Sequence, residues 1–150
     1  MKLAEALQER ADLNVKINQL RERLSNNALV QDGEEPAEDP DELLIELDDS
    51  IDRLEELMAR INKTNCMTVD EHESITQLIA KRDALKIRIN AYRAFLTEGS
   101  SAPVRARYSE IKIVSTVNVR VLQQKVDLMA KSLRETDNRI QTLNWTTELL

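Results

Sequence analysis

Four long segments of this 150-residue chain carry mostly apolar residues at alternating steps of three and four, which constrains the fold more than any other feature. This spacing keeps the side chains on one face of an α-helix. The first two stripes are Leu3, Ala6, Arg10, Leu13, Ile17, Leu20 and Leu24, then Leu44, Leu47, Ile51, Leu54, Met58 and Ile61. The other two are Ile75, Leu78, Arg82, Leu85, Ile89, Tyr92 and Leu96, then Val119, Leu122, Val126, Met129, Leu133, Thr136, Ile140 and Leu143.

Residues with known preferences for helix ends delimit these segments. Asp39 before Pro40 predicts the start of the second helix, and Ser74 and Asn118 are expected to cap the last two. Gly99 is expected to end the third helix in a left-handed conformation. A single helix cannot bury its own stripe. We therefore predict a mainly α fold in which residues 1–150 form one domain, a long antiparallel four-helix bundle.

One stretch has the character of a β-strand. Residues 108–117 hold Ile111, Ile113, Val114 and Val117 with Ser and Thr between them, and β-branched residues favour strands. We expect a small β element here, either a strand or a hairpin. A strand needs a partner for its backbone groups, so it would pair with a second copy of the chain or with residues 66–73.

Charge and cysteine content limit the function classes. The formal net charge is −6, whereas nucleic-acid binding needs a surplus of Lys and Arg, so nucleic acid is not an expected partner. Cys66 is the only cysteine, which excludes an intrachain disulfide and suits a reducing compartment. The sequence has neither a signal-peptide pattern nor an apolar run of about 20 residues. We therefore expect a cytoplasmic protein, and a membrane is not an expected partner.

Charge is also distributed unevenly along the chain. The stretch from Leu24 to Asp52 holds eleven acidic residues and no Lys or Arg, whereas basic residues predominate from Ile79 to Lys112. The two stretches are either separate solvated faces or complementary surfaces that attract. Several apolar residues also lie off the stripes: Ile45, Ile79, Ile87, Phe95, Val121 and Leu128. These features predict a homo-oligomer, either a dimer or a multiple of dimers.

Candidate catalytic groups are sparse. Nucleophilic catalysis by Cys66 would need a base and an orienting group. The sole histidine, His72, is six residues away and could approach, but it is expected in an exposed loop, and nothing else completes a triad. Glu34–Glu38 and Glu46–Asp49 formally match the carboxylate motifs of all-α nucleotide pyrophosphohydrolases. Pro36 breaks the first motif, and the two lie too close together for separate helices. We therefore expect no catalytic residue, metal or cofactor.

Three polar segments contain residues that are expected to make defined hydrogen bonds and not merely to face solvent. They close the second helix, flank the β-branched stretch and close the last helix, where Trp145 is expected to cover the end of the bundle. They are either helix caps and turns or a shared polar pocket. The pocket would be formed by Asn62, Thr64, Asn65, Arg107, Lys112, Asn144, Trp145 and Thr146.

Short motifs along the chain resemble a family of small bacterial helical proteins, some of which carry the name septicolysin. These motifs are Arg10–Leu13, Leu20–Leu24, Glu35–Pro40, Ile61–Asn65, Arg82–Asp83, Ile111–Val117 and Asn144–Leu149. The resemblance implies a helical fold, and the name implies an oxygen-labile haemolysin. Relatives have a glycine in the turn before the third helix, where this chain has Val69–Glu73.

These observations together favour an oligomeric structural or interaction protein without catalytic activity. Two alternatives remain open at this point. The first is a haemolysin-like, membrane-active protein, as the septicolysin name implies. The second is a metal- or nucleotide-dependent hydrolase.

Overall fold

The computed structural model describes residues 1–101 and 111–150, which form four helices and one two-stranded sheet. The helices are α1 (Leu3–Asn26), α2 (Pro40–Met67), α3 (Ile75–Ser100) and α5 (Val119–Thr146). The strands are β1 (Val69–Asp70) and β2 (Glu73–Ser74). The prediction of a mainly α fold with four helices and a small β element is confirmed.

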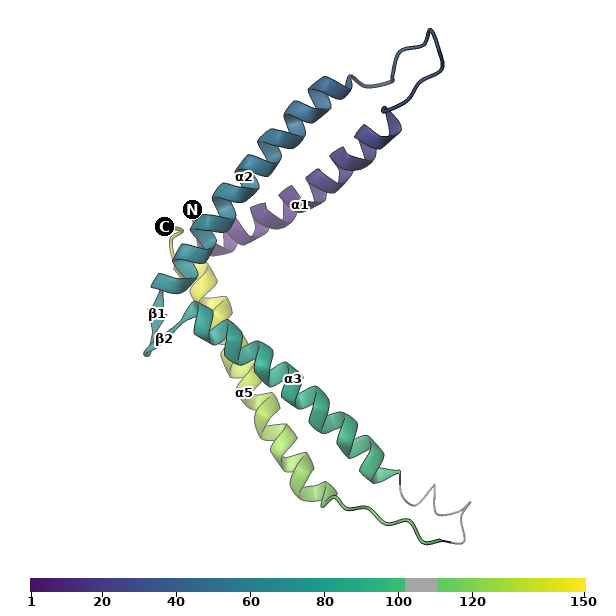
Figure 1. The fold of residues 1–150 in the computed structure, drawn as a ribbon. Coiled ribbons are helices and arrows are strands. Elements are labelled where there is room, and N and C mark those ends of the chain that lie inside the picture. Colours follow the sequence, from purple (N-terminus) through teal and green to yellow (C-terminus); the bar gives the residue numbers. More distant parts are fainter. Residues whose placement is uncertain (102–110) are drawn as a thin grey trace. The chain divides into compact units, whose positions relative to one another are not determined.

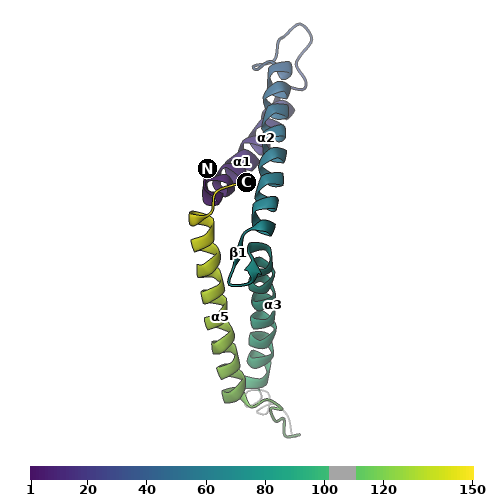
Figure 2. The same cartoon turned by 90° about the vertical axis from the view of Figure 1, so that its left-hand side faces the viewer.

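The chain divides into two compact units, each built on a pair of helices (Figure 1). The first unit comprises residues 1–69 and 143–150, and contains α1, α2 and the end of α5. The second unit comprises residues 70–142, with α3 and most of α5. In both views the helices of each pair run side by side (Figures 1 and 2). The single four-helix bundle and the single domain stay predictions.

In the first unit, α1 packs against α2 with the stripe that the sequence predicts. Leu3, Ala6 and Leu20 are buried, and the other members of the stripe are half-buried. Arg23 closes the far end by binding Glu38 with its guanidinium group. Asn27 fastens the following loop, because its side chain donates to the Arg23 carbonyl at 2.9 Å and accepts from the Glu38 N–H at 3.0 Å.

The register of α2 differs from the prediction by one residue. Three members of the predicted stripe are 42 to 46% exposed: Leu44, Ile51 and Met58. Their preceding neighbours are buried instead: Leu43, Ser50 and Leu57. Two of the three buried positions are leucines, so the apolar spacing alone does not distinguish the two lines of α2. Ser50 is tolerated inside because its hydroxyl donates to the Glu46 carbonyl at 2.7 Å.

In the second unit, α3 and α5 share a small apolar core. Ile89 and Leu96 of α3 meet Val126 of α5, and half-buried Tyr92, Leu122, Met129 and Leu133 pack around them. The predicted stripe of α3 is buried or half-buried throughout. On α5 the exception is Val119, which is 40% exposed at the first turn.

The predicted helix starts are confirmed by their caps. Asp39 Oδ1 accepts from the Asp41 N–H at 2.9 Å. Ser74 Oγ accepts from the Gln77 N–H at 3.2 Å in a capping box. Asn118 Oδ1 accepts from the N–H of Val121 at 3.2 Å.

The expected left-handed end at Gly99 is wrong, because α3 continues to Ser100. Gly99 is helical, and it leaves room for the segment before α5. A methyl group on Gly99 would lie 3.1 Å from Val117 Cγ2. Glycine at this position therefore serves the close approach of Val117 rather than the turn of the backbone.

The β element also lies elsewhere than expected. β1 and β2 pair at residues 69–74, within the stretch that the sequence suggested only as a strand's partner. Residues 111–117 adopt no strand, and the rest of the predicted element, residues 108–110, lies outside the described residues. The turn of the hairpin has left-handed φ angles of 50° at Glu71 and 91° at His72, as type I′ hairpin turns require.

Candidate functional site

The two ends of the chain meet in the first unit (Figure 1). Leu3 donates its N–H to the Thr147 carbonyl at 2.9 Å, and Leu149 donates to the Met1 carbonyl at the same distance. These bonds satisfy one of the unpaired N–H groups that every helix N-terminus leaves. The last residues therefore form an extended tail bonded along the start of α1.

Thr64 of α2 anchors this tail. Its fully buried hydroxyl accepts from the Leu150 N–H at 3.0 Å and donates to the Arg60 carbonyl at 2.8 Å. Arg60 donates its Nε to the Leu150 carbonyl at 3.0 Å. This arrangement explains why a polar residue occupies a buried position of α2.

Glu148 forms a small charged cluster with the chain's start. The Met1 ammonium group lies 3.2 Å from Glu148 Oε2, and Lys2 Nζ lies 2.7 Å from Oε1. The bond from Lys2 and the one from the terminal ammonium group hold the pKa of the Glu148 carboxyl below its usual value.

The polar pocket predicted from the sequence stays a prediction. Five of its residues belong to the first unit besides Thr64: Asn62, Asn65, Asn144, Trp145 and Thr146. Among them, the Thr146 carbonyl accepts from Lys2 Nζ at 3.0 Å. Lys112 is an exposed residue of the second unit, and Arg107 lies outside the described residues. Trp145 was expected to cover the end of the bundle, and its side chain is 64% exposed.

Arg53 links the two helices of the first unit. Its Nε and Nη2 reach the two carboxylate oxygens of Glu9 at 2.7 and 3.0 Å, and its Nη1 binds Glu56 at 2.7 Å. The bond from Arg53 lowers the pKa of Glu9. A bidentate pair of this kind fixes geometry as well as charge, so it orients α1 against α2.

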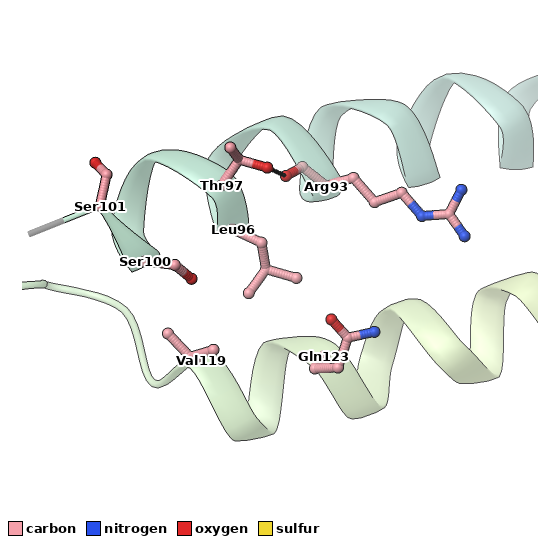
Figure 3. A pocket seen from close by; sticks show the side chains of 7 residues that line it. All are labelled: Arg93, Leu96, Thr97, Ser100, Ser101, Val119 and Gln123. Carbon is pink, nitrogen blue, oxygen red and sulfur yellow. Dashed lines mark hydrogen bonds between the residues drawn. The ribbon is translucent and has the colours of Figure 1, made fainter.

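A pocket of about 590 Å³ opens between the end of α3 and the start of α5 (Figure 3). The described residues that line it are Arg93, Leu96, Thr97, Ser100, Ser101, Val119 and Gln123. Thr97 Oγ1 donates to the Arg93 carbonyl at 3.0 Å. No imidazole, thiol or carboxylate is among these side chains, so they supply no general base.

Arg139 of α5 organises the hairpin in the second unit. It binds Asp70 Oδ2 through Nη2 at 2.8 Å and through Nε at 3.0 Å, and it binds Glu73 Oε2 through Nη1 at 3.2 Å. Lys81 lies 3.5 Å from the other oxygen of Glu73. The carboxylates of Asp70 and Glu73 are therefore paired with cations of the same unit, which gives these acidic residues a structural role.

The described part of the chain shows neither a metal-binding cluster nor a membrane-spanning helix. Residues 1–101 and 111–150 contain no group of three or more His, Cys, Asp or Glu side chains that could hold a metal ion. Cys66 is exposed and forms no disulfide. None of the described helices combines the length and apolar character needed to cross a bilayer.

Comparisons with known proteins give a family but no activity. A solved structure of a functionally unknown conserved protein from Corynebacterium diphtheriae is similar along the whole chain. It is 39% identical, with a TM-score of 0.89, and the match covers 100% of this chain and 99% of that one. None of the curated proteins matches, and neither match carries the septicolysin name. Residues 10–149 match the model of a family of unknown function (DUF6847), and the chain therefore belongs to this family.

Proposed function

We propose that this protein is a non-catalytic interaction protein that associates with copies of itself. The observation that carries the proposal is the outer row of α2, which we define as Leu44, Ile51 and Met58. Spaced seven residues apart, they form one line along the helix. Ile51 and Met58, with neighbouring side chains, border a shallow hollow of about 350 Å³. A line of exposed apolar residues on a charged helix is typical of a helix–helix interface.

The proposed occupant of this row is α3 of a second copy. α3 has its own outer row of exposed residues, spaced three and four apart: Ala84, Ile87, Ala91 and Phe95. Ile87 is 73% exposed, although it lies in the middle of a long helix. Leu44, Ile51, Met58, Ile87 and Phe95 are all more than 40% exposed, so each row offers apolar surface that a second copy would bury.

Charge favours this pairing over pairing of like rows. Asp48 and Glu55 lie on the α2 face that holds the outer row, and Lys81 and Arg88 lie on the corresponding face of α3. Both pairs are seven residues apart, so their spacings match. In addition, the first unit holds 18 Asp and Glu against 8 Lys and Arg, whereas the second holds 9 against 13. Contacts between unlike units are therefore electrostatically favoured.

Light scattering across a tenfold range of concentration tests self-association. We expect a mass that is a multiple of the 17.2 kDa chain. Ile87→Glu should reduce it, because a carboxylate would be buried in the apolar contact. Gln77→Glu on the same helix is the matched control, since Glu also completes the capping box of α3. A mass of one chain at every concentration would contradict the proposal.

A charge exchange tests the pairing of the rows. Asp48→Lys with Glu55→Lys should weaken association, because both faces would then be positive. Adding Lys81→Glu and Arg88→Glu should restore it, because the charges are again opposite. If the fourfold variant associates no better than the α2 double variant, the rows do not meet, even if the protein self-associates through another surface.

A further inference from the structure

The first unit has a groove in which Trp145, the only tryptophan of the chain, lies beside the start of α1. It has a volume of about 400 Å³ and is lined by Ala4, Glu5, Gln8, Glu9, Asp12 and Trp145. The α1 residues lie on one face of the helix, and small Ala4 leaves room beside the ring. Tryptophan is rarely left this exposed without a use, and it is enriched among residues that dominate binding energy.

The carboxylates along the groove are not equivalent. Glu9 is neutralised by Arg53 at 2.7 Å. Glu5 accepts only the neutral Lys2 N–H at 2.7 Å, and Asp12 accepts the neutral Gln8 amide at 2.9 Å. Across residues 1–101 and 111–150, neither Glu5 nor Asp12 forms a salt bridge. The groove thus combines an open aromatic face with two uncompensated negative charges.

This combination favours a cation. The face of an indole ring attracts positive charge, and a guanidinium group can stack on the ring while donating in a fork to a carboxylate. Two cations of the same unit are paired with other carboxylates, Lys2 with Glu148 and Arg53 with Glu9 and Glu56. We propose that the groove between Trp145 and α1 binds an arginine side chain of a basic segment on a partner protein.

This site goes beyond the proposed self-association, because Trp145 belongs to neither outer row. The chain's only tryptophan makes the test specific. Its fluorescence should change on titration with a short capped peptide that contains two arginines. The matched peptide with citrulline keeps the shape of the side chain but carries no charge, and it should bind at least about fivefold more weakly.

Two substitutions test the carboxylates while leaving the fold intact. Glu5→Gln keeps the side-chain bond to the Lys2 N–H, and Asp12→Asn keeps an acceptor for Gln8. Each should weaken arginine-peptide binding about threefold. Asp127→Asn is the control, because Asp127 accepts from Gln123 at 2.9 Å in the same geometry, but in the second unit. It changes the net charge equally and should leave the affinity unchanged.

Three results would overturn the proposal. The first is equal binding of the arginine and citrulline peptides. The second is a loss with Asp127→Asn as large as that with Asp12→Asn, which would indicate general attraction to an acidic protein. The third is a change in Trp145 fluorescence that follows protein concentration alone, which would show that a second copy fills the groove. Failure of self-association would leave the arginine site standing, because the groove lies within one unit.

Discussion

The two helix pairs of this protein have similar cores and opposite charge. In the first unit the buried residues include Leu3, Leu20 and Leu57, and in the second they include Ile75 and Leu78. Both pairs thus bury aliphatic side chains along one stripe of each helix. Yet the formal charge is −10 in the first unit and +4 in the second. The two units are therefore packed in the same way. They differ in surface charge, and we expect each to associate with the oppositely charged unit of a second copy.

The pairs also differ in how they are closed. The first unit joins both chain ends through backbone bonds and through Thr64. The second is closed by the Arg139 network at the hairpin. The first closure depends mainly on buried polar groups and the second on half-exposed charges. The first should therefore be less sensitive to salt.

The largest expected effect tests the equivalence of the two cores. Leu57→Ala in the first unit and Leu78→Ala in the second should each lower the free energy of unfolding by about 2–5 kcal/mol, since both side chains are fully buried. Urea denaturation followed by circular dichroism measures both. Measured at a concentration at which the protein is a single chain, Leu44→Ala is the control for α2 and should cost less than about 1 kcal/mol. A larger loss for Leu44→Ala would contradict the observed register.

The next effect tests how much the hydrogen bond between Thr64 and the C-terminal tail stabilises the first unit. Thr64→Val preserves the shape of the side chain but leaves the Leu150 N–H without its acceptor, so it should cost about 1–2 kcal/mol. Urea denaturation monitored by Trp145 fluorescence reports on the first unit. The control is Thr97→Val, which removes an equivalent bond to a helix carbonyl at an exposed site of the second unit. Equal losses would show that the tail contributes nothing specific.

Salt should act on the contact between unlike units. If opposite charge guides self-association, raising the salt concentration from about 0.05 to 0.5 M should weaken it about fivefold. Sedimentation equilibrium measures the dissociation constant. Stronger association at high salt would show that apolar burial alone drives the contact, and the charge difference between the units would then have no role in pairing.

The smallest expected effect is the loss of stability of the first unit at acidic pH. Because Arg53 lowers the pKa of Glu9 in the folded state, the ion pair stabilises the fold above the unfolded pKa of about 4.3. This stabilisation is lost as the pH falls through the folded pKa. Stability should therefore decline below about pH 4, and Glu9→Gln should make the decline shallower. Trp145 fluorescence across this range measures it, with Glu135→Gln in the second unit as the control. Identical profiles for all three proteins would contradict it.

Local chemistry made much of the fold predictable. The stripes of α1 and α3 and the caps at Asp39, Ser74 and Asn118 depend on residues close in sequence, and all are confirmed. The position of the hairpin was missed because Glu71 and His72 adopt left-handed φ angles without a glycine. Arg139, 66 to 69 residues away, holds that turn, and a partner so distant leaves no local pattern.

The sequence by itself determined that this chain forms four amphipathic helices and that its charge is divided between two regions. Only the tertiary structure decided which face of α2 is buried, because apolar residues predominate on two adjacent lines and the packing of α1 selects between them. It also decided that Trp145 is exposed beside α1. The reason is the same in both cases: periodicity records where apolar side chains lie on a helix, whereas burial depends on which neighbour covers them.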